Sequence, residues 1–310
     1  MAAAPTVPKA ATPKAKAGHR CFPPWLADRL QDCVIAPRTV PGGAGQGRHR
    51  ARSLGASVEF AEYREYAPGD PPNRIDWSVY ARSDRVLVRR FEDETALRLH
   101  VVVDRTGSMA FTTGSAPRKL DHACQLAAGL LHVAVRQGDI VRLHILEQEL
   151  RSGESMRSGH QLDPALRRLD ALEPVGEGTV ANALRSLAET GAERGLVVVI
   201  ADLLEDPVAV LEGVRLLRHA GHRVHLWQVL DRAELQLDLA AKDGLLELSE
   251  LETGRKLLVQ VDTFRDAYRK EVQAHLERLR DGCAQADAGW RLCSTSVAVD
   301  EALRSGIRAL

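Results

Sequence analysis

The stretch Leu97-Arg98-Leu99-His100-Val101-Val102-Val103-Asp104-Arg105-Thr106-Gly107-Ser108 decides the fold, because an apolar run ends there in a loop of oxygen-bearing side chains. The run 97–103 ends in three valines, as is typical of a buried strand. Asp104, Thr106 and Ser108 follow at alternate positions. One tight turn can therefore direct their three oxygen-bearing side chains at a common centre.

Two further oxygen-bearing residues stand where a strand or helix meets a loop. Thr179 opens a helical pattern after the glycine-rich stretch 175–178, and Asp202 follows 196–201, the most apolar strand candidate. No sulfur or imidazole ligand belongs to this set, and oxygen ligands alone suit a hard cation such as Mg²⁺. The sequence therefore predicts a divalent metal site formed by Asp104, Thr106, Ser108, Thr179 and Asp202.

Strands and helices alternate from residue 96 onward. The patterns predict strands at 97–103, 141–145, 196–201, 224–230 and 291–297 and helices at 119–136, 179–190, 206–219 and 262–281. Such alternation predicts an α/β fold, a doubly wound and mostly parallel sheet with helices on both faces. Ligands of such sheets bind beyond the carboxyl ends of the strands. Asp104 and Asp202 can therefore meet although they are distant in sequence.

The chain divides by composition into three parts. Residues 1–20 are mainly Ala, Pro and Lys, which predicts a disordered tail. Residues 21–95 predict a small ordered N-terminal segment packed on the core, with Trp77 among its buried anchors. Residues 96–310 form the α/β domain.

Bulk composition is that of a soluble globular protein, at 45% hydrophobic and 27% charged residues. Lys+Arg and Asp+Glu balance at 42 each, so the whole molecule has no electrostatic preference for nucleic acid or anionic membrane. The five cysteines include no C-x-x-C pair, which argues against a zinc site and fits a reducing compartment. With no leader-like or membrane-spanning stretch, we expect a cytoplasmic protein.

The oxygen-bearing residues resemble the metal-ion-dependent adhesion site of von Willebrand factor type A domains. That site has Asp-x-Ser-x-Ser followed by a Thr and an Asp, and this chain has Thr106 at the middle position. The stretches 59–70, 74–77, 81–82 and 92–95 are similar to the family catalogued as domain of unknown function 58. The resemblance spans about residues 48 to 300.

The resemblance implies a type A-like, Rossmann-like fold that acts as a binding module without established catalysis. Asp104 and Asp202 would hold the ion partly through water, and Thr106, Ser108 and Thr179 would ligate through their hydroxyls. A partner protein would complete the coordination with an acidic side chain. The resemblance also implies a MoxR-type AAA+ ATPase as that partner, in the assembly or maturation of protein complexes.

Three other interpretations stay open from the residues alone. Asp104, Ser108 and Asp202 could simply cap helices. The chain could be a Mg²⁺-dependent phosphate-ester hydrolase, although a haloacid dehalogenase-type enzyme needs a carboxylate at position 106 as its general acid. It could also bind nucleic acid through its basic N-terminal third, since no acidic residue occurs between Cys33 and Glu59. We expect a protein that is not an enzyme.

Overall fold

The computed structural model describes residues 18–36, 59–67, 75–83, 85–92, 96–113, 116–237, 245–249 and 256–310. Most of the predicted tail 1–20 lies outside these residues. The chain separates by its internal contacts into two units, Met1–Pro37 with Arg98–Leu310 and Arg38–Leu97. Within the residues described, no helix is both long and apolar enough to cross a membrane.

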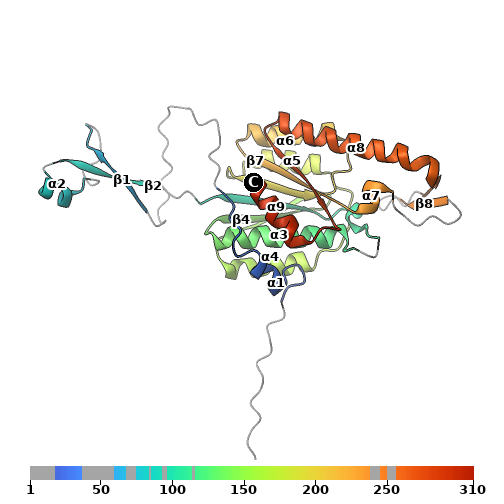
Figure 1. Cartoon of the computed structure of the whole chain (residues 1–310), viewed down its shortest axis with the longest axis horizontal. Coiled ribbons are helices and arrows are strands. Elements are labelled where there is room, and N and C mark those ends of the chain that lie inside the picture. The colour runs from blue at the N-terminus through green and yellow to red at the C-terminus, as the bar shows by residue number, and fades with distance from the viewer. Residues whose placement is uncertain are drawn as a thin grey trace, which may run out of the picture. The chain divides into compact units, whose positions relative to one another are not determined.

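The larger unit is built on a six-stranded sheet (Figure 1). Its strands lie in the order β10 (Gly289–Ser294), β7 (Arg223–Leu230), β6 (Leu196–Ala201), β3 (Arg98–Asp104), β4 (Ile140–Leu146) and β5 (Leu150–Met156). Every neighbouring pair is parallel except β4 with β5, which is antiparallel. The prediction of a mostly parallel sheet is confirmed.

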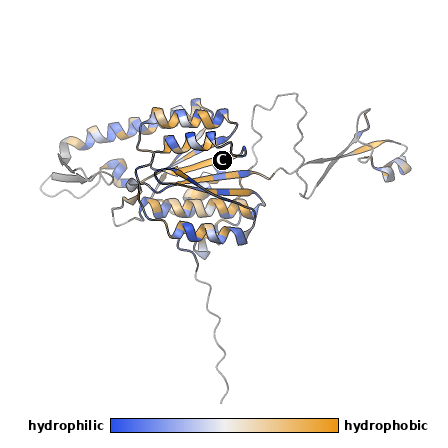
Figure 2. Ribbon diagram, turned by 180° about the vertical axis from the view of Figure 1, so that it is seen from behind, coloured by the Kyte–Doolittle hydropathy of each residue, from blue (hydrophilic) through white to orange (hydrophobic). Residues whose placement is uncertain are grey.

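Helices cover both faces of this sheet, as predicted for a doubly wound fold. One layer contains α5 (Val180–Glu189), α6 (Pro207–His219) and α8 (Val261–Gln285), and the other contains α3 (Lys119–Arg136), α4 (Gly159–Asp170) and α9 (Val299–Ala309). Figure 2 shows the central strands and the sheet-facing side of α3 as hydrophobic. All six residues of β6 are buried, because helices cover that strand on both sides.

Residues 18–36 pack with the larger unit, around the short helix α1 (Pro24–Arg29). Leu26 and Leu30 are fully buried, and the guanidinium of Arg136 in α3 donates to the Leu30 carbonyl at 2.9 Å. The carboxylate of Asp170 accepts from the backbone N–H of Cys21 at 2.7 Å. The part of the predicted segment 21–95 before residue 37 therefore belongs with the α/β unit.

The smaller unit contains the antiparallel pair β1 (Glu59–Glu65) and β2 (Leu87–Glu92) and the helix α2 (Trp77–Ser83). Asp76 immediately precedes α2, and its Oδ1 accepts from the backbone N–H of Ser78 at 3.0 Å. The side chain of Trp77 is 60% exposed, so the prediction that Trp77 is a core residue is wrong. An aromatic residue in the first turn of a short helix can face solvent, and the sequence pattern did not resolve which side it takes.

Three short elements complete the described structure. They are the 3₁₀ turn Gly107–Ala110, the helix α7 (Arg232–Gln236), and the antiparallel hairpin of β8 (Leu245–Ser249) with β9 (Lys256–Gln260). The first two lie at the carboxyl ends of β3 and β7, where they shape the edge of the sheet that carries the predicted site.

Candidate metal centre

The candidate site lies at the point in the sheet where the order of strand addition reverses, between β3 and β6. From β3 the chain moves outward to β4 and β5, and it then returns to β6 on the other side of β3 before moving outward to β7 and β10. The loops after β3 and β6 therefore diverge to opposite faces of the sheet, and ligands of open α/β sheets bind at such a switch point. Asp104 ends β3 and Asp202 follows β6, so both carboxylates lie at this switch point.

The loop after β3 folds back on the carboxylate of Asp104. Its Oδ1 accepts from the backbone N–H of Thr106 at 2.8 Å, which fixes the side chain's orientation. The hydroxyl oxygens of Thr106 and Ser108 lie 3.2 Å apart. Adjacent oxygens around an octahedral Mg²⁺ lie about 3 Å apart when each bond is about 2.1 Å. The two hydroxyls are thus spaced as neighbouring ligands of one ion.

The loop before α5 is joined to the loop after β3 by two backbone hydrogen bonds. Gly107 N–H donates to the Gly176 carbonyl at 3.1 Å, and Val175 N–H donates to the Arg105 carbonyl at 2.7 Å. Thr179 ends this loop as the N-cap of α5, and its hydroxyl oxygen accepts from Asn182 N–H at 3.3 Å. A capping hydroxyl keeps another lone pair for a second contact.

The loop after β6 connects Asp202 to the same helix start. The carboxylate of Glu205 accepts from the N–H groups of Val180 at 2.6 Å and Ala181 at 3.2 Å. Leu203, which lies between Asp202 and Glu205 in this loop, has a φ of 53°, an unusual left-handed conformation for a bulky residue. His275 of α8 stabilises this turn by donating from Nε2 to the Leu203 carbonyl at 2.7 Å. Backbone strain of this kind concentrates at functional loops.

A lysine from the other helix layer reaches this group of carboxylates. Lys119, the first residue of α3, donates from Nζ to Asp202 Oδ2 at 2.9 Å and to Glu234 Oε1 at 2.6 Å. Its side chain is completely buried. Burial opposes the ammonium charge, but the attraction of Asp202 and Glu234 outweighs it and raises the pKa of Lys119. A protonated lysine therefore neutralises one of the carboxylates at the switch point.

The second carboxylate, that of Asp104, has no such cationic partner among the described residues. Burial, followed by the negative charge of Asp202, raises the pKa of Asp104 to about 8, against the opposing hydrogen bond from Thr106. A cation beside Asp104 would stabilise its ionised form. Within the described residues, Asp202 Oδ1 accepts one long hydrogen bond, from Leu204 N–H at 3.5 Å, so this oxygen keeps a lone pair that an ion or its bound water could use.

The donor set fits a hard divalent cation. Hydroxyl and carboxylate oxygens are the ligands that Mg²⁺ takes, and Mg²⁺ usually keeps several waters. Among the residues described, no three His, Cys, Asp or Glu side chains gather as metal ligands. Any ion at the switch point would therefore rely on the hydroxyls of Thr106 and Ser108. Such a site has few charged ligands of its own and would be completed by a carboxylate from outside.

The structure places the predicted site residues in three adjoining loops. Asp104, Thr106 and Ser108 form one hydrogen-bonded group, and the negative charge of Asp202 is close enough to act on Asp104. Thr179 lies on the adjoining loop, and in the described part of the chain its hydroxyl contacts Asn182 N–H. That these residues hold a metal stays a prediction.

Three charged residues of this region were not predicted as part of the site: Lys119, Glu205 and Glu234. For Glu234 a signal was present, since Asp231-x-x-Glu234 is a capping box, and the structure shows both of its hydrogen bonds. Lys119 lies on the apolar face of its predicted helix, where a charged residue needs a partner. No local pattern indicates which carboxylates would be that partner.

The chain belongs to the family described as protein of unknown function DUF58, whose model matches residues 62–278. Its relatives include the uncharacterized protein Rv1480 of Mycobacterium tuberculosis and the uncharacterized protein Mb1516 of Mycobacterium bovis. Each is 27% identical over 257 residues, which cover 81% of this chain and 79% of the relative. The predicted family membership is confirmed.

Similar solved structures include the conserved hypothetical protein BatB from Bacteroides thetaiotaomicron, with a TM-score of 0.45 and 13% identity over 69% of this chain and 98% of that one. The SpRpn10 VWA domain has a TM-score of 0.41 and 10% identity over 67% of this chain and 94% of that one. At such scores the similarity carries no conclusion about function.

Proposed function

We propose that this protein is a binding module, not an enzyme, that engages an acidic residue of a partner protein through a divalent cation. Asp104, Thr106, Ser108, Thr179 and Asp202 hold the ion, which is Mg²⁺ in this proposal. The supporting observation is the 3.2 Å separation of the Thr106 and Ser108 hydroxyls beside two buried carboxylates at the switch point. An Asp or Glu carboxylate of the partner fills the open position of the ion.

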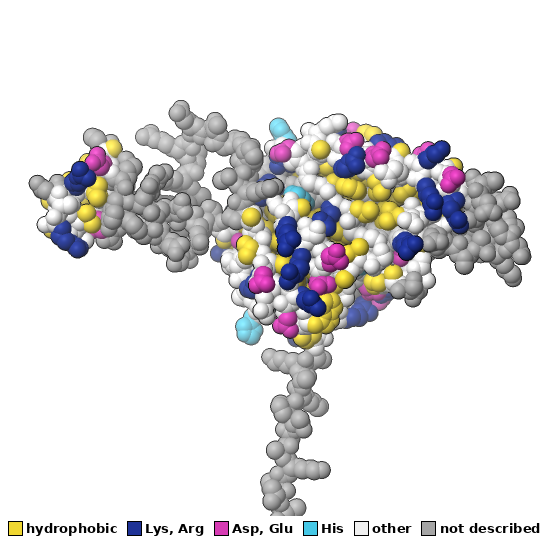
Figure 3. Space-filling view, in the orientation of Figure 1, with side chains coloured by type: hydrophobic (Ala, Val, Ile, Leu, Met, Phe, Trp, Pro, Cys, Tyr) yellow, Lys and Arg dark blue, Asp and Glu magenta, His cyan; other side chains and the backbone are white. Residues whose placement is uncertain are grey.

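The partner in this proposal is a MoxR-type AAA+ ATPase, and the pair acts in the assembly or maturation of protein complexes in the cytoplasm. This choice follows from the family resemblance of the motifs. It agrees with the state of the cysteines, since all five are free and buried. A protein partner, as opposed to a nucleic acid, also agrees with the surface charge. In Figure 3, basic and acidic side chains intermix on the described surface facing the viewer, whereas a nucleic-acid interface has a patch of basic side chains.

Calorimetric titration of Mg²⁺ into the full chain tests the metal. Wild-type protein should give saturable heats, and Asp104→Ala should abolish them. Asp266→Ala, which changes an exposed aspartate on α8, is the matched control and should titrate like the wild type. Equal heats from wild type and Asp104→Ala would refute the metal site.

The partnership needs a separate measurement. In a pull-down with the full chain, recovery of a MoxR-type AAA+ ATPase should fall when EDTA is added and when Asp104 is replaced by Ala. Equal recovery with and without chelator would show that the ion has no part in the association.

The two alternative functions have their own tests. Turnover of p-nitrophenyl phosphate that requires Mg²⁺ and disappears in Asp104→Ala would favour a hydrolase. Binding of an oligonucleotide with a steep salt dependence, lost on deletion of residues 1–52, would favour nucleic-acid recognition. We expect neither result.

A further inference from the structure

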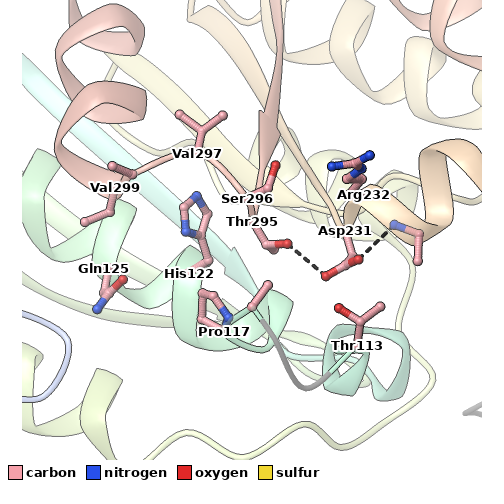
Figure 4. A pocket seen from close by; sticks show the side chains of 13 residues that line it. Thr113, Pro117, His122, Gln125, Asp231, Arg232, Thr295, Ser296, Val297 and Val299 are labelled. Atoms are coloured by element: carbon pink, nitrogen blue, oxygen red, sulfur yellow. Dashed lines mark hydrogen bonds between the residues drawn. The ribbon is translucent and has the colours of Figure 1, made fainter. Parts of the chain in front are cut away.

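A cavity of about 700 Å³ opens beyond the carboxyl ends of β7 and β10 (Figure 4). Its walls are the residues after these strands, 231–233 and 295–298, the start of α9, the first half of α3, and Thr113, Ala116 and Pro117 before α3. Ligand pockets commonly have volumes of this order. The cavity is separate from the predicted metal ligands, none of which lines it.

A buried polar atom beside this cavity has no hydrogen-bond partner among the described residues. His122 of α3 is only 1% exposed, and its Nε2 makes no hydrogen bond within the described structure. Burial lowers the pKa of His122 to about 4, so the imidazole is neutral at physiological pH. An unsatisfied buried polar atom costs about 1–3 kcal/mol, which a hydrogen-bonding ligand would recover. Figure 4 shows the ring on the α3 side of the cavity, beneath Val297.

The first turn of α9 provides a second polar feature. Ala298 is the N-cap of this 11-residue helix and makes no side-chain capping hydrogen bond. The N–H groups of the first turn therefore lack intrahelical partners, and they carry the positive end of the helix dipole. Asp300 in that turn pairs with Arg29 at 4.0 Å. Ala298 and Val299 line the cavity, so this helix start adjoins the space beside His122.

The charged residues of the lining have different roles. Asp231 is 1% exposed, and both of its oxygens already accept hydrogen bonds, from Ala233 N–H at 2.9 Å and from the Thr295 hydroxyl at 3.0 Å. Asp231 is thus part of the wall. Arg232 is exposed and contributes a positive charge to the lining.

The remaining lining combines apolar side chains, among them Pro117, Val297 and Val299, with the neutral polar side chains of Gln125 and Ser296. An apolar surface next to Arg232, a helix start and a neutral imidazole suits a ligand with a small apolar body and an anionic end. We propose that this cavity binds a carboxylate attached to a short apolar group, in which Arg232 and the α9 N-terminus receive the carboxylate and His122 Nε2 donates to it. The source is a small carboxylic acid or the carboxyl-terminal residue of a peptide.

This site goes beyond the proposed metal-dependent function and does not need the ion. The two regions are nevertheless neighbours, because the helix that carries Arg232 also carries Glu234, whose carboxylate accepts from Lys119. Lys119 in turn donates to Asp202. Binding is therefore measured in EDTA, where failure of the metal site has no effect on the result.

The experiment compares N-acetyl-leucine with N-acetyl-leucinamide, which share an apolar body and differ in the carboxylate. Calorimetry with the full chain should show that the acid binds and that the amide binds at least tenfold more weakly. Arg232→Gln should weaken binding of the acid at least tenfold. Arg215→Gln is the control and should not change this affinity, because Arg215 is an exposed residue of α6 that does not line the cavity. In NMR spectra of the wild-type protein, the acid should also shift the His122 ring resonances. This measurement does not require a His122 variant that folds.

A third probe, acetyl-Ala-Ala-Leu with a free carboxyl terminus, identifies the source. Tighter binding than N-acetyl-leucine indicates a peptide terminus, and weaker binding indicates a small acid. Absence of binding by both acids, equal binding of acid and amide, or unchanged affinity in Arg232→Gln would each overturn the proposal.

Discussion

The ammonium of Lys119 lies 2.9 Å from the carboxylate of Asp202, at the point where the two halves of the sheet diverge. This ion pair joins the first residue of α3, on one face of the sheet, to the loop that follows the central strand β6. A buried ion pair of this kind gives limited net stability, but removal of one partner leaves an uncompensated charge. Lys119 also means that Asp202 is partly neutralised before any metal ion binds.

Replacement of Lys119 by Met should destabilise the protein by about 3–5 kcal/mol, because Asp202 and Glu234 would remain buried without their cation. The free energy of unfolding in urea measures this. Lys119→Met with Glu234→Gln should recover part of the loss, since one of the two charges is removed. The control is Lys270→Met, at an exposed lysine of α8. A loss of less than 1 kcal/mol in Lys119→Met would contradict the ion pair.

Loss of Lys119 should strengthen Mg²⁺ binding, although it weakens the stability of the fold. Without Lys119, both oxygens of Asp202 become available to a divalent ion, and one competing positive charge is lost. In Lys119→Met/Glu234→Gln, calorimetry should therefore give a Mg²⁺ affinity at least tenfold higher than in the wild type. Unchanged affinity would mean that Lys119 and the ion do not compete for Asp202.

Thr179 has two assigned roles that can be separated. As the N-cap of α5, its hydroxyl accepts from Asn182 N–H, and loss of such a cap costs about 1 kcal/mol. Thr179→Ala should show this loss in EDTA, where no divalent ion contributes. If the hydroxyl also ligates the ion, Mg²⁺ should stabilise Thr179→Ala less than it stabilises the wild type or Thr179→Ser. Equal stabilisation of all three would leave Thr179 as a cap alone.

Two buried histidines within the neighbouring strands β3 and β4, His100 and His144, make stability depend on pH. His100 Nε2 donates to the Glu193 carbonyl at 3.0 Å, so its Nδ1 must accept from His144 Nε2 at 3.1 Å if both rings are neutral. His144 Nδ1 then accepts from the Ser152 hydroxyl at 2.8 Å. Burial, with the neighbouring charges of His100 and Arg142, lowers the pKa of His144 to about 3.

Because the folded-state pKa of His144 is lowered, the unfolded chain binds this proton first as pH falls below about 6.5, and stability decreases. The contribution of His144 is complete above pH 6.5 and is lost toward pH 3. His144→Gln should reduce the slope of unfolding free energy against pH by up to about 1.4 kcal/mol per pH unit between pH 5 and 6. His160→Gln, at an exposed histidine, is the control. Parallel slopes for wild type and His144→Gln would contradict the buried neutral ring.

Much of the α/β unit could be predicted because its elements are bounded by strong local signals. The bounds of α3, β6 and α6 agree with the predicted ranges to within a residue. Gly138, with a φ of 85°, follows the end of α3, and Asp206 caps α6 before Pro207 at its first position. These signals lie within a few residues of the elements that they end or begin.

The strand β5 and helix α4 were not predicted. The sequence of β5, Leu-Arg-Ser-Gly-Glu-Ser-Met, is mostly polar because this strand is the edge of the sheet, and α4 carries Pro164 in its interior. The ion pairs of Lys119 were equally out of reach, because Lys119, Asp202 and Glu234 lie far apart in the sequence. Pairings across a sheet depend on the tertiary fold, which local patterns do not encode.

Anomalous diffraction from crystals of this chain grown with Mn²⁺ in place of Mg²⁺ tests the proposed metal site at the switch point most directly. We predict one anomalous peak within bonding distance of the Thr106 and Ser108 hydroxyls, beside the Asp104 and Asp202 carboxylates. A map with Mn²⁺ bound elsewhere, or with a water-filled switch point at saturating Mn²⁺, would contradict it.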